Sequence, residues 1–378
     1  MEIENLTFDI ITTNKCNLAC KYCIENEYTD YHCHDNVKYD IDKLISFIDN
    51  MLNDGLNTIS VNFWGGEPTL ETDAITNILD YYNNSKYMKD GRINFFISTN
   101  GYKVDKLLSC ADKYKYQTVR GNPFFKIQVS YDGRPINNIK RLNKNGKDVT
   151  DDVIETILHL QNHNIPYVLK STVTFDMLRY MYEAYNDIVN VLHAGNYFPT
   201  LDYRNSESDN MTDDELTKYK DDIKHSLKLI AKDEIKYMRQ NVTQSSNFAW
   251  FNHNVAECTA GNNMYAIDSD GTIYQCHGCL LLESKSDHIV GNIVDININN
   301  AILNNRVRYK AAIQKYDFIC NKCDATFCLR CNAAKYAASN KSNYFDKWFD
   351  YGAQNRLCML YRYISNIARA VRIKCGNN

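Results

Sequence analysis

The sequence predicts an α/β protein: a partial (β/α)6 barrel, TIM-like in its alternation of strands and helices, followed by a small cysteine-rich domain and a C-terminal helix. Two observations predict this fold. Short apolar runs alternate six times with segments of helical periodicity over residues 6–203, which is typical of a parallel sheet. Cysteines then concentrate in the last third of the chain. Six repeats are too few for a closed eight-stranded barrel, so we expect an open one.

The barrel elements follow from apolar periodicity. The predicted strands are residues 6–11, 59–63, 93–98, 125–130, 167–174 and 197–203. The predicted helices between them are residues 41–52, 75–82, 103–114, 153–160 and 178–192. A longer helix begins at Thr212, where Glu215 stands at capping-box spacing and acidic residues fill the first turn. We expect this helix to lead out of the barrel.

The predicted domain boundaries follow the change in composition. Residues 1–235 form the barrel, 236–257 a bridging segment, 258–358 the cysteine-rich domain and 359–378 the C-terminal helix. Within the third part, two short alternating segments at 265–268 and 272–274 predict a hairpin that ends at Cys276. The last helix carries apolar residues at helical spacing, and we expect it to pack back on the barrel.

Length and charge narrow the class of protein. The 378 residues suggest two or three domains, and 44% hydrophobic residues are ample for a core. The net charge of −3, from 43 basic and 46 acidic residues, does not favour a nucleic-acid or an acidic membrane partner. No apolar run is long enough to span a bilayer, and the N-terminus lacks the basic start of a secretory signal. We therefore expect a cytoplasmic protein.

Fourteen cysteines in such a chain do not indicate a disulfide framework. Three of them follow the first predicted strand with the spacing Cys16-x3-Cys20-x2-Cys23. Thiolates hold iron–sulfur clusters, and three ligands on a four-iron cluster leave one iron open. A zinc knuckle that lacks one ligand, or a set of buried free thiols, is the alternative. Zinc would need a fourth Cys or His at close spacing.

With the aromatic Tyr22 before its third cysteine, this stretch resembles the radical SAM signature. In that family S-adenosylmethionine chelates the open iron through its amino and carboxylate groups. The resemblance continues at the next three strand ends, where barrels of this type carry their chemistry. Gly65-Gly66-Glu67-Pro68 is similar to the family motif that holds the amino group of S-adenosylmethionine, and its glycines allow close backbone approach.

The loops at 98–101 and 130–133 resemble the family's Thr-Asn-Gly and Ser-x-Asp-Gly segments. The second of these implies that Asp132 lies near the cofactor ribose and the substrate. Asp132 is therefore a candidate catalytic residue. Each motif alone could be an ordinary turn, but they follow successive strands in family order. Lys170 and Thr172 are added to this set from their position in the fifth predicted strand alone. The predicted cofactor-binding residues are Tyr22, Gly65, Gly66, Glu67, Ser98, Asn100, Ser130, Lys170 and Thr172.

The last third of the chain resembles the SPASM domain, an extension of radical SAM enzymes that carries two auxiliary clusters. Its run Cys320-x2-Cys323-x4-Cys328-x2-Cys331 is one residue shorter than the family spacing in each of two gaps. Family order implies that one cluster is held by Cys320, Cys323, Cys328 and Cys358. It implies that the other is held by Cys258, Cys276 and Cys331, with Cys279 as an available fourth ligand. Without Cys279, an open iron could take a substrate thiolate. A compact zinc site is the alternative.

His277 departs from the family pattern. In sulfatase-maturing relatives an Asp follows the corresponding cysteine and looks like the general base. A histidine can take a proton near neutral pH, so a catalytic role remains chemically open. A hydrogen bond to the cluster is the other role that its position allows. The departure weakens the case for sulfatase maturation.

The resemblance implies a radical SAM enzyme that modifies a ribosomally made peptide. Its cofactors would be S-adenosylmethionine and three [4Fe–4S] clusters, one binding S-adenosylmethionine and two auxiliary. S-adenosylmethionine would be cleaved to a 5′-deoxyadenosyl radical, which removes hydrogen from the peptide. A thioether cross-link is our first expectation. Formylglycine formation in a sulfatase is the second, and a zinc-binding scaffold without radical chemistry is an alternative of another class.

The expected partners are the peptide substrate and an electron donor of the flavodoxin or ferredoxin type. Many such maturases carry a leader-recognition domain ahead of the barrel. Here the first predicted strand starts within a few residues of Met1. We therefore expect leader recognition, if it is needed, to come from the barrel, from the polar loop at 205–210 or from a separate leader-binding protein.

Overall fold

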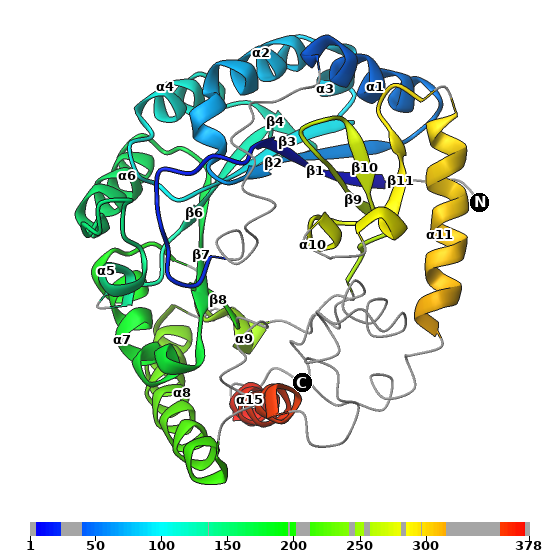
Figure 1. Cartoon of the computed structure of the whole chain (residues 1–378). Helices are drawn as coiled ribbons and strands as arrows, with labels where there is room; N and C mark the ends of the chain where they lie inside the picture. Colours follow the sequence, from blue (N-terminus) through cyan, green and yellow to red (C-terminus); the bar gives the residue numbers. More distant parts are fainter. Residues whose placement is uncertain are drawn as a thin grey trace. The chain divides into compact units, whose positions relative to one another are not determined.

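The chain folds into two compact units in the computed structural model (Figure 1). The first comprises Met1–Val129, Leu142–Val168 and Thr259–Lys315, and the second comprises Ser130–Arg141, Leu169–Cys258 and Tyr316–Asn378. The structure describes residues 5–23, 40–134, 136–195, 197–201, 212–241, 246–252, 258–280, 285–295, 297–314 and 356–374.

A largely parallel sheet forms the centre of the first unit, with the strand order β11-β10-β9-β1-β2-β3-β6. Neighbours β1 and β2, β2 and β3, β3 and β6, and β1 and β9 all pair in parallel. Along β2, Ile59, Val61 and Phe63 are buried while Ser60 and Asn62 between them are half-buried. This period of two buries one face of the strand. The bounds are β1(Asn5–Thr13), β2(Thr58–Gly65), β3(Ile93–Thr99) and β6(Phe125–Ser130).

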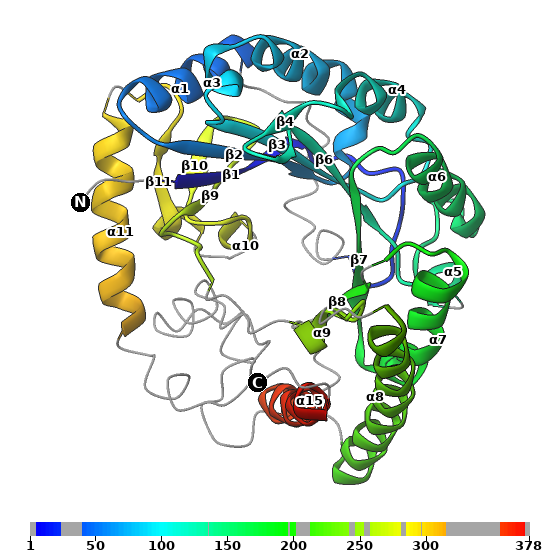
Figure 2. The ribbon, with the colours of Figure 1, turned by 180° about the vertical axis from the view of Figure 1, so that it is seen from behind.

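Four helices of the first unit lie along one face of these strands (Figure 2), namely α1(Ile41–Asn53), α2(Thr72–Asn83), α4(Asp105–Tyr114) and α6(Thr150–Asn162). Local sequence sets their ends. The Asp40 side chain accepts a hydrogen bond from the N of Asp42 and caps α1, and Gly55, at φ +100°, follows the helix. The shorter elements are η2(Pro68–Glu71), α3(Lys86–Lys89), β4(Thr118–Val119) and β5(Asn122–Pro123).

The predicted hairpin in the last third of the chain is confirmed. It consists of β9(Met264–Ile267) and β10(Thr272–Tyr274), which pair antiparallel. After it come α10(His277–Leu280), η6(Lys285–His288), β11(Ile289–Asn292) and α11(Ile298–Gln314). Because β9 pairs with β1, residues 259–315 belong to the first unit, whereas the sequence placed 258–358 in a domain of its own. Pairing between strands so distant along the chain leaves no local pattern in the sequence, and the predicted domain boundaries stay predictions.

The second unit contains β7(Tyr167–Val173) and β8(Tyr197–Leu201), which pair in parallel. Its long helix α8(Asp213–Asn241) begins at the predicted cap, where Thr212 and Glu215 exchange side-chain and backbone hydrogen bonds. The predicted C-terminal helix is α15(Arg356–Lys374), which packs on α8 and on α9(Ala249–Asn252). The short helix α5(Ile136–Lys140) completes this unit.

The helix predicted at 178–192 is not a single α-helix. The chain forms η3(Phe175–Tyr180), α7(Met181–Tyr185) and a π-helical turn, η4(Asn186–Val191). In this last turn the N of Leu192 bonds to the carbonyl of Asp187. The Asp187 side chain is held by Tyr131 and Arg134, which are contacts that helical periodicity does not record.

The order of strands and helices confirms the predicted partial (β/α)6 fold. Strands β1, β2, β3, β6, β7 and β8 fall on the six predicted runs. Among the predicted ligands, Cys320, Cys323, Cys328 and Cys331 lie outside the described residues, and Cys358 lies in α15. No helix in the described ranges is long and apolar enough to cross a membrane.

Candidate functional site

The first cysteine group forms a loop directly after β1. A turn brings the N of Cys23 to the carbonyl of Cys20, at 3.0 Å. Burial raises the pKa of the Cys16 thiol to about 12, although a hydrogen bond from the N of Leu18 acts to lower this pKa. The Glu67 carboxylate and the other two thiols, as negative charges nearby, raise it further. The charged thiolate forms of these cysteines would therefore be unfavourable without a bound cation. Bound iron cations would compensate their negative charge.

Within the described ranges, no group of three or more Cys, His, Asp or Glu side chains lies close enough together to hold one metal ion. In a four-iron cluster each cysteine binds a separate iron. Tyr22 is half-buried in the turn between the second and third cysteines.

The two glycines after β2 bring that strand end against the chain that leads into the cysteine loop. The N of Gly66 donates to the carbonyl of Thr13 and the N of Glu67 donates to that of Lys15, both at 2.8 Å. A Cβ on Gly66 would stand 2.4 Å from the Lys15 oxygen, which is closer than real Cβ contacts come. Beside this contact, the Oδ1 of Asn14 is buried without a hydrogen-bond partner among the described residues. An acceptor of this kind suits an ammonium group.

Glu67 is 1% exposed, and its carboxylate is occupied by the chain's own donors. It accepts from the N and Oγ1 of Thr69 at 3.1 and 2.7 Å, from the Oγ1 of Thr99 at 2.8 Å and from the N of Asn100 at 2.7 Å. Burial raises the pKa of Glu67, and these hydrogen bonds oppose the rise. The side chain ties the end of β2 to the end of β3, so a ligand ammonium would have to share oxygens that are already engaged.

Ser98 lies near the end of β3, and Asn100 follows the last residue of that strand. The Ser98 Oγ accepts from the Nε2 of Gln128 on β6, at 2.9 Å. Asn100 is 7% exposed and points its side chain at the cysteine loop, where its Nδ2 lies 2.7 Å from the Oδ1 of Asn17 and 3.7 Å from the Sγ of Cys16. The structure therefore brings the loop after β3 and the first cysteine together, as the family resemblance implies.

In the second unit, Asp132 is fully buried and its carboxylate is engaged. One oxygen accepts from the Nε of Arg141 at 3.0 Å and the other from the N of Thr172 at 2.9 Å. The ion pair is buried on both sides, at 0% and 7% side-chain exposure. This geometry favours a positioning role, in which Asp132 holds the start of the second unit against β7.

The remaining predicted residues of the second unit share partial exposure. Ser130, Lys170 and Thr172 are half-buried. Lys170 and Thr172 lie on the same face of β7, because they are two residues apart on a strand. Their neighbours Leu169 and Ser171 are buried on the opposite face. The structure thus gives these polar side chains one common face, as expected from their spacing.

His277, at the start of α10, contacts β1 and β2. Its Nδ1 lies 2.8 Å from the Oδ2 of Asp9, whose Oδ1 accepts from the Nδ2 of Asn62 at 2.8 Å. The imidazole stacks on Trp64 with ring centroids 5.1 Å apart and an interplanar angle of 22°. The Asp9 side chain is 3% exposed and that of His277 is 41% exposed. With Nδ1 donating to the carboxylate, Nε2 is the ring nitrogen that can accept a hydrogen bond.

Sequence reasoning missed Asp9. The only local signal was an acidic residue inside the apolar run of the first strand, at 6–11. Its partners His277 and Asn62 are distant along the chain, and only the pairing of β1 with β2 and β9 brings them together.

The cysteines on either side of His277 are buried and adjacent. The Sγ atoms of Cys276 and Cys279 lie 3.5 Å apart. Their mutual contact and burial raise the pKa of Cys276 well above its usual range. The pair is therefore placed as two ligands of one metal site would be. Cys258 belongs to the second unit and Cys331 lies outside the described residues, so the two auxiliary ligand sets stay predictions.

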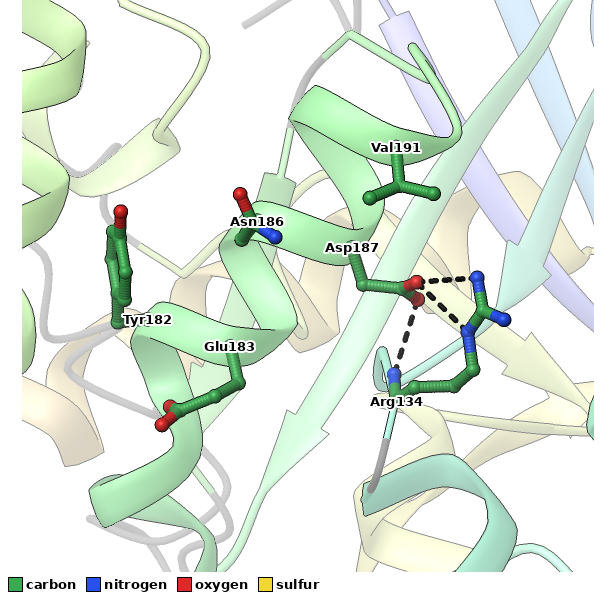
Figure 3. Close-up of a pocket in the computed structure, with 6 residues that line it drawn as sticks. All are labelled: Arg134, Tyr182, Glu183, Asn186, Asp187 and Val191. Carbon is green, nitrogen blue, oxygen red and sulfur yellow. Dashed lines mark hydrogen bonds and ion pairs between the residues drawn. The ribbon is translucent and has the colours of Figure 1, made fainter.

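The second unit also contains a cavity of about 470 Å³ beside the π-helical turn. Figure 3 shows the Arg134 guanidinium turned toward Asp187, with N–O distances of 2.7 and 2.9 Å. Tyr131 donates to the same carboxylate. The charges of Arg134 and Asp187 are paired with each other, which favours a structural role for these two residues. The lining residues are Arg134, Tyr182, Glu183, Asn186, Asp187 and Val191.

These features can now be compared with known proteins. The model of the Radical SAM superfamily matches residues 10–191, from β1 through the π-helical turn. Residues 10–191 therefore form a radical SAM domain. The superfamily implies S-adenosylmethionine and one [4Fe–4S] cluster, and Cys16, Cys20 and Cys23 stay the predicted ligands of that cluster.

Two curated relatives with named activities align with most of this chain. The radical SAM cyclopropyl synthase TigE of Paramaledivibacter caminithermalis is 22% identical over 286 residues, covering 71% of this chain and 57% of TigE. The cysteine-type anaerobic sulfatase-maturating enzyme of Clostridium perfringens is 22% identical over 363 residues, covering 87% and 90%. For two of the curated relatives, the chain spans only 54% and 57% of their length.

The fold is shared with a solved structure, that of native anSMEcpe with bound AdoMet and Cp18Cys peptide. The TM-score is 0.72 and the identity 19%, over 98% of this chain and 99% of that one. At this level of identity the likeness establishes the fold, and it agrees with the partial barrel described above.

Proposed function

We propose that this chain is a radical SAM enzyme that modifies a peptide side chain. One observation carries the proposal. The Cys16-x3-Cys20-x2-Cys23 loop lies at the end of β1, against Gly66 at the end of β2 and Asn100 at the end of β3, within the family match. When bound, the cluster supplies the electron that splits a carbon–sulfur bond of S-adenosylmethionine, giving methionine and a 5′-deoxyadenosyl radical.

The chain's own residues bind and orient the reactants. Gly65 and Gly66 let the end of β2 pack closely on the backbone of residues 13–15 before the cysteine loop, and Asn14 offers a buried acceptor for the ammonium of S-adenosylmethionine. Lys170 and Thr172 present polar groups from one face of β7.

His277 is proposed to contact the substrate through Nε2. Asp9 holds the ring by Nδ1, and Trp64 limits its tilt by stacking. The adjacent Cys276 and Cys279 are proposed ligands of an auxiliary cluster, with Cys258 and Cys331. Cys320, Cys323, Cys328 and Cys358 are the proposed ligands of a second one. These clusters would accept the electron left on the substrate radical or bind its thiolate.

A peptide substrate is supported by the relative that is named as a sulfatase-maturating enzyme and by the peptide bound in the solved structure. Thioether formation at a cysteine is our first candidate reaction. Formylglycine formation in a sulfatase is the second, and it is favoured by the 87% of this chain that aligns with the Clostridium perfringens enzyme. The electron donor would be a flavodoxin or ferredoxin, and leader recognition could require a separate protein.

The test uses anaerobically purified and reconstituted protein. We expect about twelve irons per chain for three four-iron clusters, and release of 5′-deoxyadenosine under dithionite. A Cys20→Ala variant should lose that release. Cys110→Ala is the matched control, because Cys110 is a buried thiol on α4 outside both cysteine groups. Zinc with little iron, or equal nucleoside release from both variants, would refute the radical reaction and favour the zinc scaffold.

Two cysteine peptides then separate the candidate reactions by mass spectrometry. The first would be any cysteine peptide whose gene neighbours the gene of this chain, and the second is a cysteine peptide from a sulfatase. Loss of two hydrogen atoms from the first supports a thioether. Replacement of the thiol by an aldehyde in the second supports formylglycine. Nucleoside release without a change in either peptide would contradict both substrate assignments.

A further inference from the structure

Asn100 stands beside the first thiol of the cysteine loop. Its Nδ2 lies 3.7 Å from the Sγ of Cys16, within hydrogen-bonding range for a sulfur acceptor. The N of Leu18 lies 3.4 Å from the same sulfur. One donor comes from the cysteine loop itself and the other from the end of β3. Asn100 is 7% exposed, and its contact with the sulfur is partly buried.

The orientation of the Asn100 amide is fixed by its other partners. Its Oδ1 accepts from the N of Tyr102 at 2.9 Å, which assigns the oxygen end. Its Nδ2 donates to the Oδ1 of Asn17 at 2.7 Å, and Asn17 donates to the carbonyl of Tyr102 at 3.0 Å. One N–H of the amide is therefore used by Asn17, and the other is directed at Cys16.

The backbone of Asn100 is fixed as well. Its N donates to the buried Glu67 carboxylate at 2.7 Å, and the neighbouring Thr99 donates to the same group at 2.8 Å. Glu67 follows the glycine pair whose backbone packs on Thr13 and on the chain before Cys16. A buried carboxylate with several donors is rigid, so the amide is presented to the sulfur by a preorganised support.

We propose that Asn100 is a positioning residue that hydrogen-bonds to the Cys16 thiolate and raises the reduction potential of the cluster held there. The proposal rests on the proposed function, since it requires Cys16 to be a cluster ligand. The physical reason is charge. A donor to a ligand sulfur stabilises the more negative, reduced cluster more than the oxidised one, and hydrogen bonds to sulfur are among the factors that set cluster potentials.

The size of the effect follows from the strength of such a bond. Hydrogen bonds to charged groups are worth more than neutral ones, and part of that strength differs between the two redox states. We expect loss of the donor to lower the ratio of reduced to oxidised cluster about tenfold at a fixed solution potential. For a one-electron couple this corresponds to about 59 mV toward more negative values.

The experiment is an anaerobic potentiometric titration of the full, reconstituted chain, followed by electron paramagnetic resonance. The first cluster is identified by the change that added S-adenosylmethionine causes in its signal. Asn100→Asp keeps the Oδ1 acceptor for Tyr102 but replaces the donor, and Asn100→Ala removes both. Asn94→Ala is the matched control, because Asn94 lies on β3, six residues upstream of Asn100 and roughly 20 Å away.

Both Asn100 variants should show the more negative potential, and Asn94→Ala should keep that of the wild type. An unchanged potential in cluster-loaded Asn100 variants overturns the proposal. So does loss of the first cluster in both variants, since the role would then be structural. A wild-type chain with no signal that responds to S-adenosylmethionine instead refutes the proposed function itself.

Discussion

Replacing Gly66 with alanine should destabilise the first unit and disturb the cysteine loop. The new Cβ would stand 2.4 Å from the carbonyl oxygen of Lys15 and 2.9 Å from that of Asn14. Both obstacles are backbone, so neither can turn away as a side chain would. The two strands must separate, which weakens the hydrogen bonds that link the 66–67 segment to Thr13 and Lys15.

The magnitude follows from these contacts. Overpacking costs about 1–3 kcal/mol, and each weakened hydrogen bond adds about 0.5–1.5 kcal/mol. We expect a loss of about 2–4 kcal/mol in the free energy of unfolding. At about 2–4 °C per kcal/mol for a unit of this size, the melting temperature should fall by roughly 4–16 °C.

The assay is thermal unfolding of the anaerobic protein, with iron content measured on the same samples. Gly291→Ala is the matched control. Gly291 also lacks a positive φ, but a Cβ there would meet the ends of the Ile298 and Asp295 side chains, which can move. If Gly66→Ala has the same melting temperature as Gly291→Ala and keeps its iron, the packing argument is wrong. If it melts normally but binds S-adenosylmethionine weakly, the glycine serves the ligand and not the chain.

Three further outcomes are expected. Asp132→Asn should unfold more easily by about 3 kcal/mol in chemical denaturation, because it removes the negative charge that pairs with the buried Arg141 guanidinium. Equal stability would contradict a contribution from this buried pair. Asp9→Asn should leave 5′-deoxyadenosine release unchanged but slow peptide modification at least about tenfold, because the hydrogen bond that orients His277 changes. Equal slowing of both steps would refute a role of His277 toward the substrate. Burial lowers the pKa of His288 to about 4, below its usual value, so the unfolded chain takes up the proton first and stability should fall as pH drops from about 6.5 to 4. The slope should approach about 1.4 kcal/mol per pH unit, and His288→Gln should flatten the curve of unfolding free energy against pH; identical curves would contradict the buried neutral imidazole.

Local patterns were sufficient for the elements and for the loops between them. Strands such as 93–98 and 125–130 carry the period of two that buries one face, and their observed bounds differ by at most one residue. Helix caps were equally local, as at Thr212, whose partner Glu215 is three residues away. Interactions of this range depend on neighbours in the chain, so the sequence records them.

Departures occurred where distant residues decide the structure. The helix expected at 178–192 includes a π-helical turn, in which Asp187 is held by Tyr131 and Arg134. Donors that include Thr99 and Asn100 enclose Glu67, which local sequence did not indicate, and its role toward a ligand ammonium stays a prediction. In each case a buried carboxylate found partners from another element, and burial without such partners would cost several kcal/mol.

The sequence by itself determined the partial barrel, the order of its motifs and the cysteine loop that marks the radical SAM family, because these depend on periodicity and on spacing within a few residues. Only the tertiary structure decided that Asp9 holds His277, that β9 joins β1 and that Asn100 faces the Cys16 sulfur. The physical reason is that hydrogen bonds and strand pairing act over a few ångströms in space, whatever the distance along the chain.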